Sequence, residues 1–231
     1  MRVSASWLSF ASKMTNSQSP SPSKYASWGA YFNRPMTIKD IVKRVFAHLD
    51  YLAFSSTRSS LVEIGTGSGA QAIVLSYYLP FVVSLDNDWE VLVRAKRENQ
   101  RLHGRLVLVC ADTRFLPFKN NSFGICILQG FYEHLNDDEL AQMAQEQSQV
   151  SPLVVASVPS NLYPRKDYGN ERLLTPNQWR ELLRRGLSSN SLRIGVRYYH
   201  FDPEAWLYSI KVSKWLGHFH EMITIKKNFQ K

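Results

Sequence analysis

Three glycines at alternate positions follow a short apolar run that carries one carboxylate, in the stretch Leu61-Val-Glu-Ile-Gly-Thr-Gly-Ser-Gly-Ala70. Glycines let the backbone turn tightly against a ligand, and the start of a following helix offers free N–H groups. The spacing therefore predicts a nucleotide-type ligand between a parallel strand and a helix. Gly65, Gly67 and Ala70 also satisfy the dinucleotide pattern G-x-G-x-x-G/A, so this stretch alone leaves two kinds of ligand open.

Three acidic residues are expected near the carboxyl ends of neighbouring strands: Glu63, Asp86 and Asp112. Ligands of an open parallel sheet bind outside the carboxyl ends of its strands, so these side chains should converge on one crevice. Asp86 can accept both hydroxyls of a ribose, and Asp112 can accept the exocyclic amine of adenine. Glu63 beside the glycine turn would repel a pyrophosphate and would suit a cation. The acids thus favour an adenosine-bearing ligand other than a dinucleotide.

Apolar runs alternate with amphipathic segments along the chain. Strands are expected at 60–64, 81–86, 105–112, 123–129, 152–159, 192–199 and 219–225, and helices at 37–52, through the 70s, 88–102, 137–147, 175–186 and 202–216. Strands that are apolar almost throughout are typical of a parallel sheet covered on both faces. We expect an α/β fold with a doubly wound, mostly parallel sheet of seven strands, an antiparallel C-terminal strand and helices on both faces.

The net charge of +9 is concentrated at the start of the chain. Residues 1–39 carry +5 and no acid, from Arg2, Lys13, Lys24, Arg34 and Lys39. The remaining residues carry only +4, so charge is a weak argument for a nucleic-acid partner. Residues 1–36 are predicted to be a flexible, basic, Ser-rich tail ending in an aromatic arm, and residues 37–231 a single folded domain.

The cysteine and histidine pattern gives no sign of a metal site. Cys110 and Cys126 each lie in an apolar run, where a buried thiol is expected, and no Cys-x-x-Cys pattern is present. His218 and His220 would share one side of a strand and are not expected to bind metal. A reducing compartment is favoured, and no apolar run is long enough for a membrane span. We expect a cytoplasmic protein, with organelle targeting through the basic N-terminal segment as the alternative.

The segment Glu63-Ile-Gly65-Thr-Gly67-Ser-Gly69 resembles the E-x-G-x-G-x-G motif of class I S-adenosylmethionine-dependent methyltransferases, and Asp86 matches their ribose-binding acid. Residues 111–123 resemble the D-a-x-x-L-P-F-x-d-n-S-F-D segment of their type-11, ubiquinone/menaquinone-biosynthesis-like branch, although Gly124 stands where that branch has Asp. The resemblance covers about residues 37–226. It implies a Rossmann-like sheet, S-adenosyl-L-methionine as cofactor, and a methyltransferase activity (EC 2.1.1.-).

The resemblance also implies roles for individual residues. The cofactor-binding set would be Glu63, Gly65, Thr66, Gly67, Gly69, Asp86, Asn87, Asp112, Thr113 and Gln129. Within it, Gly65 and Gly67 would lie under the methionine part of the cofactor, and Gln129 near its amino group. A general base is needed only if the acceptor must lose a proton, and the candidates are His134, Tyr132 and Glu133. No metal ligand is assigned.

Other aromatic side chains are candidates for the acceptor side. We expect the arm at Trp28 to Phe32 to act as a lid, and Tyr163, Tyr168, Tyr199 and His200 to line the acceptor pocket.

Several functions remain open on the sequence. We expect methyl transfer by in-line displacement to a small-molecule acceptor. The alternatives are an RNA or protein methyltransferase and a non-catalytic, cofactor-binding partner subunit. The segment Gln129-Gly-Phe-Tyr132 lacks the prolines of the Asp/Asn-Pro-Pro-Tyr/Phe pattern, which counts against base amines. Glu63 and the segment from Asp112 to Phe118 oppose a dehydrogenase.

Overall fold

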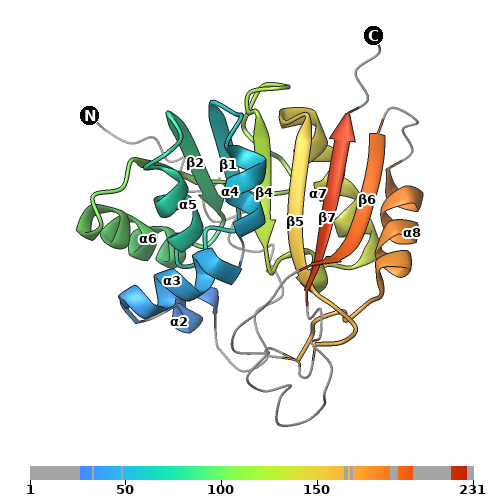
Figure 1. The fold of residues 1–231 in the computed structure, drawn as a ribbon, viewed down its shortest axis with the longest axis horizontal. Helices are drawn as coiled ribbons and strands as arrows, with labels where there is room; N and C mark the ends of the chain where they lie inside the picture. Colours follow the sequence, from blue (N-terminus) through green and yellow to red (C-terminus); the bar gives the residue numbers. More distant parts are fainter. Residues whose placement is uncertain are drawn as a thin grey trace, which may run out of the picture.

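A seven-stranded sheet runs through the computed structural model, which describes residues 27–32, 34–47, 49–163, 166, 169–187, 192–199 and 220–227 (Figure 1). The strands are β1 (Ser60–Ile64), β2 (Phe81–Asp86), β3 (Leu106–Cys110), β4 (Ile125–Gln129), β5 (Leu153–Pro159), β6 (Leu192–Tyr199) and β7 (His220–Lys227). Their order is β3-β2-β1-β4-β5-β7-β6. The pairs among β1 to β5 are parallel, whereas β7 is antiparallel to both β5 and β6. The predicted Rossmann-like sheet is confirmed.

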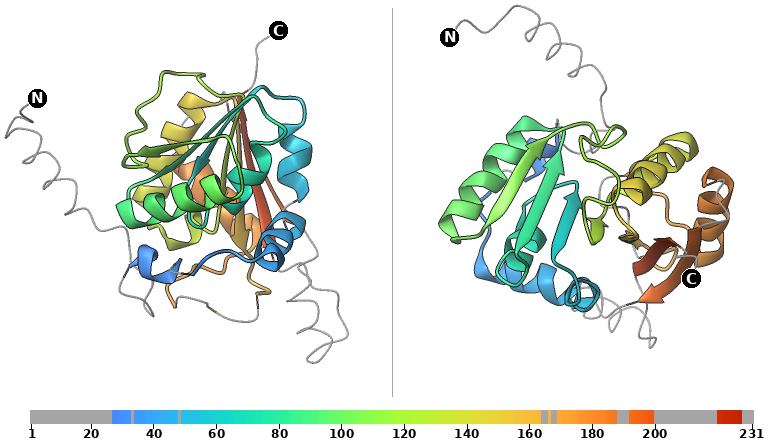
Figure 2. Two further views of the ribbon diagram at one scale, coloured as in Figure 1. Left: turned by 90° about the vertical axis from the view of Figure 1, so that its left-hand side faces the viewer. Right: turned by 90° about the horizontal axis from the view of Figure 1, so that it is seen from above.

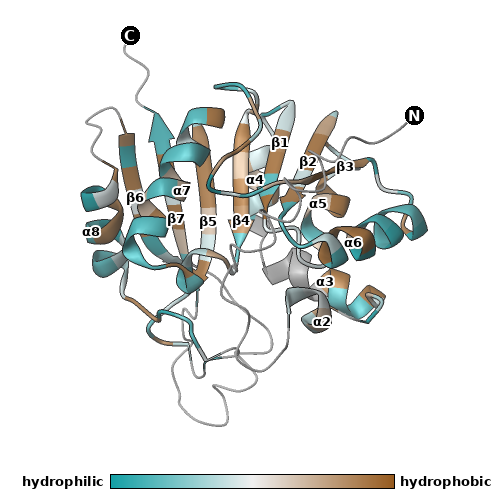
Figure 3. Ribbon diagram, turned by 180° about the vertical axis from the view of Figure 1, so that it is seen from behind, coloured by the Kyte–Doolittle hydropathy of each residue, from teal (hydrophilic) through white to brown (hydrophobic). Residues whose placement is uncertain are grey.

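Helices cover both faces of this sheet (Figures 1 and 2). The helices are α2 (Trp28–Tyr31), α3 (Ile38–Ala47), α4 (Leu49–Ser55), α5 (Ala70–Leu75), α6 (Trp89–Arg101), the short 3-10 helix η1 (Tyr132–His134), α7 (Asp137–Val150) and α8 (Pro176–Gly186). Helices α3 to α6 lie on one face, and the view from behind shows α7 and α8 on the other (Figure 3). None of the helices in the described residues is long and apolar enough to cross a membrane.

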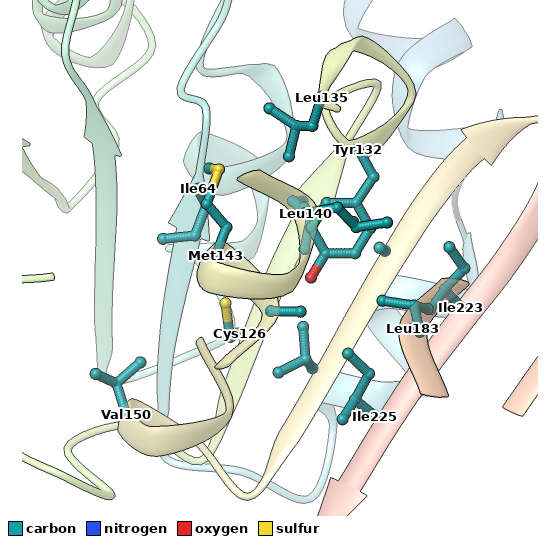
Figure 4. Close-up of a cluster of buried hydrophobic side chains, with 14 of the residues drawn as sticks. Ile64, Cys126, Tyr132, Leu135, Leu140, Met143, Val150, Leu183, Ile223 and Ile225 are labelled. Carbon is teal, nitrogen blue, oxygen red and sulfur yellow. The ribbon is translucent and has the colours of Figure 1, made fainter. Parts of the chain in front are cut away.

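Two apolar clusters form the core, one on each face of the sheet. The cluster under α7 and α8 includes Cys126, Tyr132, Leu140 and Ile223 (Figure 4). The cluster on the opposite face joins α4 and α5 to the sheet. In it the buried hydroxyl of Tyr51 donates a hydrogen bond to the carbonyl of Leu128 at 2.6 Å, which fixes α4 to the carboxyl end of β4.

Some predicted boundaries differ from the structure for identifiable reasons. The single helix predicted at 37–52 is two helices, α3 and α4, and the second continues to Ser55. Strand β3 ends before Asp112, because that side chain accepts the backbone N–H of Arg114 at 2.9 Å and turns the chain out of the sheet. Strand β4 begins at Ile125, since the N–H of Phe123 donates instead to the carbonyl of Val150. The tail at 1–24 and the helix predicted at 202–216 lie outside the described residues.

The two cysteines differ in environment. Cys126 is buried in the core as predicted. The expectation of a buried thiol at Cys110 is wrong, because Cys110 is exposed. Its strand β3 is the edge of the sheet, where β2 is its only neighbour among the described strands.

A close approach of α7 and α8 gives a stability prediction. A Cβ at Gly186 would lie 2.5 Å from Ala141 Cβ and 3.0 Å from Ala141 Cα. Alanine would raise helix propensity, yet overpacking against backbone atoms costs more, so we expect Gly186→Ala to lower the free energy of unfolding by about 1–2 kcal/mol. Urea denaturation measures this, with the exposed Arg184→Ala as a control that should change little. Unchanged or increased stability in Gly186→Ala would contradict the close packing of these helices.

Candidate functional site

The glycine turn joins the buried strand β1 to helix α5. Gly65, Gly67 and Gly69 have φ angles of 76°, 51° and 76°, a left-handed region that residues with a side chain rarely adopt. The N–H of Gly65 donates to the carbonyl of Leu85 on β2, and the N–H of Gly69 donates to the carbonyl of Thr66. The predicted strand–turn–helix arrangement is therefore present, and it places the turn at the carboxyl end of the sheet.

Two phenylalanine rings rest on this turn. A Cβ at Gly65 would lie 2.7 Å from the ring of Phe131, which follows β4. A Cβ at Gly67 would lie 2.9 Å from the ring of Phe32, which follows α2. The two glycines are thus required by their backbone angles and also by the close approach of these rings.

Glu63 is held beneath the turn by hydroxyl groups. Its side chain is buried, and the hydroxyl of Ser84 on β2 donates to Glu63 Oε2 at 2.5 Å. The same hydroxyl lies 2.8 Å from Thr66 Oγ1, so β1, β2 and the turn share one polar network. Ser84 was not singled out from the sequence; its signal was one polar residue within an otherwise apolar strand.

Asp86 lies half-buried at the end of β2, beside the turn. Its Oδ1 accepts the N–H of Asp88 at 3.0 Å. Burial raises the pKa of Asp86 to about 6, and the Asp88 carboxylate adds to this effect, while the backbone N–H groups of Asp88, Gly67 and Thr66 oppose it. The side chain therefore carries its charge at neutral pH and loses it in mild acid. Asn87, next to it, is exposed.

Asp112 follows β3 on the far side of Asp86 and is engaged by a neighbouring cation. Arg114 Nη2 lies 2.6 Å from Asp112 Oδ2, and Arg114 Nε donates to both carboxylate oxygens at 3.0 and 3.1 Å. This pairing was not predicted from the sequence, although the two residues are only two positions apart. Thr113 is buried, with its hydroxyl 3.7 Å from Met143 Sδ, and Gln129 is half-buried at the end of β4.

The three candidates for a general base have different surroundings. Tyr132 lies in the apolar cluster of Figure 4 and is fully buried, and its hydroxyl donates to Gln147 Oε1. Burial raises the pKa of that phenol well above its usual value, so Tyr132 is suited to packing rather than to proton transfer. His134 and Glu133 have their side chains beside one another, with His134 Nε2 3.9 Å from Glu133 Oε1.

His134 is fixed by two partners. Its Nδ1 lies 2.9 Å from Asn170 Oδ1, and its ring meets the ring of Trp28 edge-on at a centroid distance of 5.3 Å. Burial lowers the pKa of His134, although the Asn170 contact and the nearby charge of Glu171 act in the opposite direction. The imidazole is therefore neutral at neutral pH.

The aromatic arm, defined here as residues 27–32, connects these parts of the site. The N–H of Gly29 donates to Asp88 Oδ2 at 3.1 Å, and Asp88 also caps α6. From this anchor Trp28 reaches His134 and Phe32 reaches Gly67. The arm thus lies across the glycine turn and reaches the segment after β4, and its role as a lid stays a prediction.

The structure does not gather every predicted residue at the turn. Tyr163 lies against His220, with ring centroids 5.4 Å apart, at the ends of β5 and β7. Tyr168, His200 and the side chain of Tyr199 lie outside the described residues. Within the described part of the chain, no group of three or more His, Cys, Asp or Glu side chains is placed to hold a metal ion.

Comparisons with known proteins agree with this geometry. Residues 61–151 match a family model described as a methyltransferase domain. No curated protein matches the chain. Among solved structures, the PH0226 protein from Pyrococcus horikoshii OT3 is 14% identical with a TM-score of 0.63, over 82% of this chain and 92% of that one. A SAM-dependent methyltransferase from Aquifex aeolicus is 14% identical with a TM-score of 0.60, over 84% and 100%.

A third similar structure is the putative methyltransferase of Haloferax volcanii in complex with the Trm112 methyltransferase activator. It is 14% identical with a TM-score of 0.59, over 87% of this chain and 98% of that one. At such identities these likenesses establish the fold alone. The sheet order defines the class I methyltransferase fold. Residues 61–151, which include the glycine turn, match a methyltransferase domain, so the activity is that of an S-adenosylmethionine-dependent methyltransferase.

The docking of the arm can be tested directly. A Cβ at Gly29 would lie 2.5 Å from Glu90 Oε2 and 2.7 Å from Glu90 Cβ. We therefore expect Gly29→Val to detach the arm, so that amide hydrogens of residues 28–32 exchange about tenfold faster or more, roughly 1.4 kcal/mol. Hydrogen–deuterium exchange read by mass spectrometry measures this. Arg34→Ala, which removes an exposed ion pair with Asp40, is the control and should leave the arm protected. Equal exchange in both variants would contradict the docking.

Proposed function

We propose that this methyltransferase transfers a methyl group by in-line displacement to a small-molecule acceptor. The observation that carries the proposal is the position of the arm across the glycine turn and the segment after β4. A site covered by its own chain suits an acceptor that can be enclosed. Enclosure aligns the reacting groups and excludes water, and orientation alone can supply on the order of 7–11 kcal/mol.

The chain's residues fit the cofactor in their chemistry. S-adenosylmethionine supplies an activated methyl group on a sulfonium centre. We assign its binding to Glu63, Gly65, Thr66, Gly67, Gly69, Asp86, Asn87, Asp112, Thr113 and Gln129. In support, the left-handed glycines shape the strand–turn–helix arrangement at the carboxyl end of β1, and Asp86 offers a carboxylate beside the turn.

Asp112, the residue assigned to adenine, has a neighbour that the expected contact did not include. Asp112 is already paired with Arg114, so we propose that the carboxylate and the guanidinium bind there as a unit. Carboxylate oxygens have more than one lone pair, and a bidentate arginine leaves acceptor capacity for an amine.

Two finer assignments are also part of the proposal. We place the chain in the type-11 branch because of residues 111–123, in which Leu116 and Phe123 are buried as anchors of the segment. We also assign residues 37–231 to one methyltransferase domain and residues 1–36 to a tail that ends in the arm. For any acceptor that must lose a proton, we assign His134 or Glu133 as the base rather than Tyr132.

Fractionation of labelled product tests the acceptor class. The protein is incubated with methyl-labelled S-adenosylmethionine and an extract of its source cells, and the extract is then separated into small molecules, RNA and protein. We expect label in the small-molecule fraction. Label in RNA, with steeply salt-dependent RNA binding, would favour the RNA alternative. Label in the protein fraction would favour a protein methyltransferase, and activity only with an added protein would favour a partner subunit.

Calorimetry tests the cofactor site. We expect Asp86→Ala to weaken the binding of S-adenosylhomocysteine by about tenfold or more, roughly 1.4 kcal/mol, because the ribose hydroxyls lose their acceptor. Asp50→Ala, on α4, is the matched control and should bind as the wild type does. Wild-type protein that is folded and does not bind the ligand would contradict the proposal.

The raised pKa of Asp86 predicts a pH dependence for the same binding. In the free protein this carboxyl takes up a proton as the pH falls through about 6. Since the ribose requires the charged form, the dissociation constant should rise below pH 6, approaching about tenfold per pH unit, and stay level above pH 7. Asp86→Asn should bind weakly with no such rise. A wild-type affinity that is constant from pH 5 to 8 would show that Asp86 does not accept the ribose.

A further inference from the structure

Two buried glutamates lie on the acceptor side of the glycine turn. Glu133 in η1 is 3% exposed, and Glu171 before α8 is 4% exposed. The negative charge of Glu171 acts on Glu133, and burial, the larger cause, raises the pKa of Glu133 to about 8. Glu133 Oε2 has no hydrogen-bond partner within the described residues. Burying a carboxyl oxygen without a hydrogen-bond partner costs free energy, so a ligand that pairs with this atom would recover part of that cost.

Among the described residues, no charged basic side chain pairs with the carboxyl of Glu133. The closest basic side chain is that of His134, and burial keeps its imidazole neutral at neutral pH. Arg172 donates its backbone N–H to the carbonyl of Glu133, and its guanidinium pairs with Asp137 through Nη1 and stacks over the ring of Trp179 at 5.4 Å, while its Nε and Nη2 have no hydrogen-bond partner within the described residues. The described residues therefore supply no cation that neutralises Glu133.

Glu133 lies close to the glycine turn, at the carboxyl ends of the parallel strands. A Cβ at Gly130, the residue that follows β4, would lie 3.5 Å from Glu133 Oε1. The next residue, Phe131, packs on Gly65 of the glycine turn. The carboxyl and the turn are thus linked through two consecutive residues after β4, Gly130 and Phe131.

Aromatic rings complete the surroundings. Trp28 of the arm meets His134, whose Nε2 faces Glu133, and Trp28 also stacks with Phe32 above the turn. The faces of indole rings attract cations, and the attraction is stronger away from water. A buried carboxyl next to a neutral imidazole, whose ring in turn meets a tryptophan, is suited to an ammonium group rather than to an anion.

We propose that Glu133 and Trp28 bind the ammonium group of the acceptor, so that the acceptor class is a small amine. An amine that arrives charged pairs with the Glu133 carboxylate, and an amine that arrives neutral takes the proton of the Glu133 carboxyl; both routes give the same ion pair. Where this nitrogen is the methyl acceptor, the ammonium group returns its proton to the Glu133 carboxylate before transfer, because only the neutral amine has a lone pair for the methyl group. An alcohol of the same shape offers only a neutral hydrogen bond. This inference rests on the proposed function in taking the segment after β4 as the acceptor side.

Matched amine and alcohol probes test the inference without any turnover. The probes are n-butylamine against n-butanol, and 2-phenylethylamine against 2-phenylethanol. Ligand-observed NMR titrations use the full chain, at neutral pH, with S-adenosylhomocysteine added in excess. We expect each amine to bind at least about tenfold more tightly than its alcohol. Equal binding of amines and alcohols by the wild type would overturn the inference.

Two variants with matched controls test whether the preference for amines depends on Glu133 and Trp28. Glu133→Gln keeps the volume and removes the charge, so the amine preference should disappear, whereas the exposed Glu181→Gln should retain it. Trp28→Leu should weaken amine binding several-fold without changing alcohol binding, whereas Trp89→Leu on the exposed side of α6 should not. A preference that survives in Glu133→Gln would overturn the assignment. If Glu133→Gln does not fold, Trp28→Leu and the wild-type probe pairs still decide the question.

The design separates this inference from the proposed function. Binding of S-adenosylhomocysteine is measured first, and its absence would count against the cofactor site alone. The probe pairs can be titrated in either case. Cofactor binding without an amine preference would leave the methyltransferase proposal standing and reject the amine acceptor.

Discussion

The absence of side chains at Gly65 and Gly67 is the constraint on which the site depends. Both residues have positive φ angles, and both are approached by an aromatic ring at a distance that a Cβ could not share. The first ring, Phe131, belongs to the segment after β4, and the second, Phe32, belongs to the arm. The glycine turn therefore determines the backbone path into α5 and also the positions of the arm and of the segment after β4. A methyl group at Gly65 or Gly67 would disturb all three parts together.

Three buried or half-buried acidic residues of the site differ in the hydrogen-bond partners of their carboxyl groups. Glu63 accepts a hydroxyl hydrogen bond from Ser84, and Asp86 is faced by backbone N–H groups of the turn. Both arrangements favour a carboxylate that stays in place under or beside a ligand. Glu133 has an oxygen with no partner in the described residues, and its pKa is raised further than that of Asp86. Glu63 and Asp86 thus have hydrogen-bond partners within the fold, whereas Glu133 Oε2 has none among the described residues.

The sequence predicted the centre of the sheet better than its margins. Strands β1 and β2 were located to the residue, because buried parallel strands are apolar throughout and the glycines mark where β1 ends. The edge strand β3 was predicted too long, and Cys110 was expected to be buried, because apolar content does not reveal which strand lacks a neighbour. The Arg114 pairing and the partnerless oxygen of Glu133 depend on side-chain directions that no pattern of residue types specifies.

The short turn between β2 and α6 links the two sides of the site. Asp86 Oδ1 accepts the N–H of Asp88, while the carboxylate of Asp88 caps α6 and accepts the N–H of Gly29 in the arm. The residue assigned to the ribose and the residue that anchors the arm thus differ by two positions and are hydrogen-bonded to each other. Because the arm carries both Phe32 and Trp28, its placement over the glycine turn and over His134 follows from this single anchor together with the two ring contacts. The position of the arm over His134 therefore depends on Asp88, which follows β2, as well as on the segment after β4.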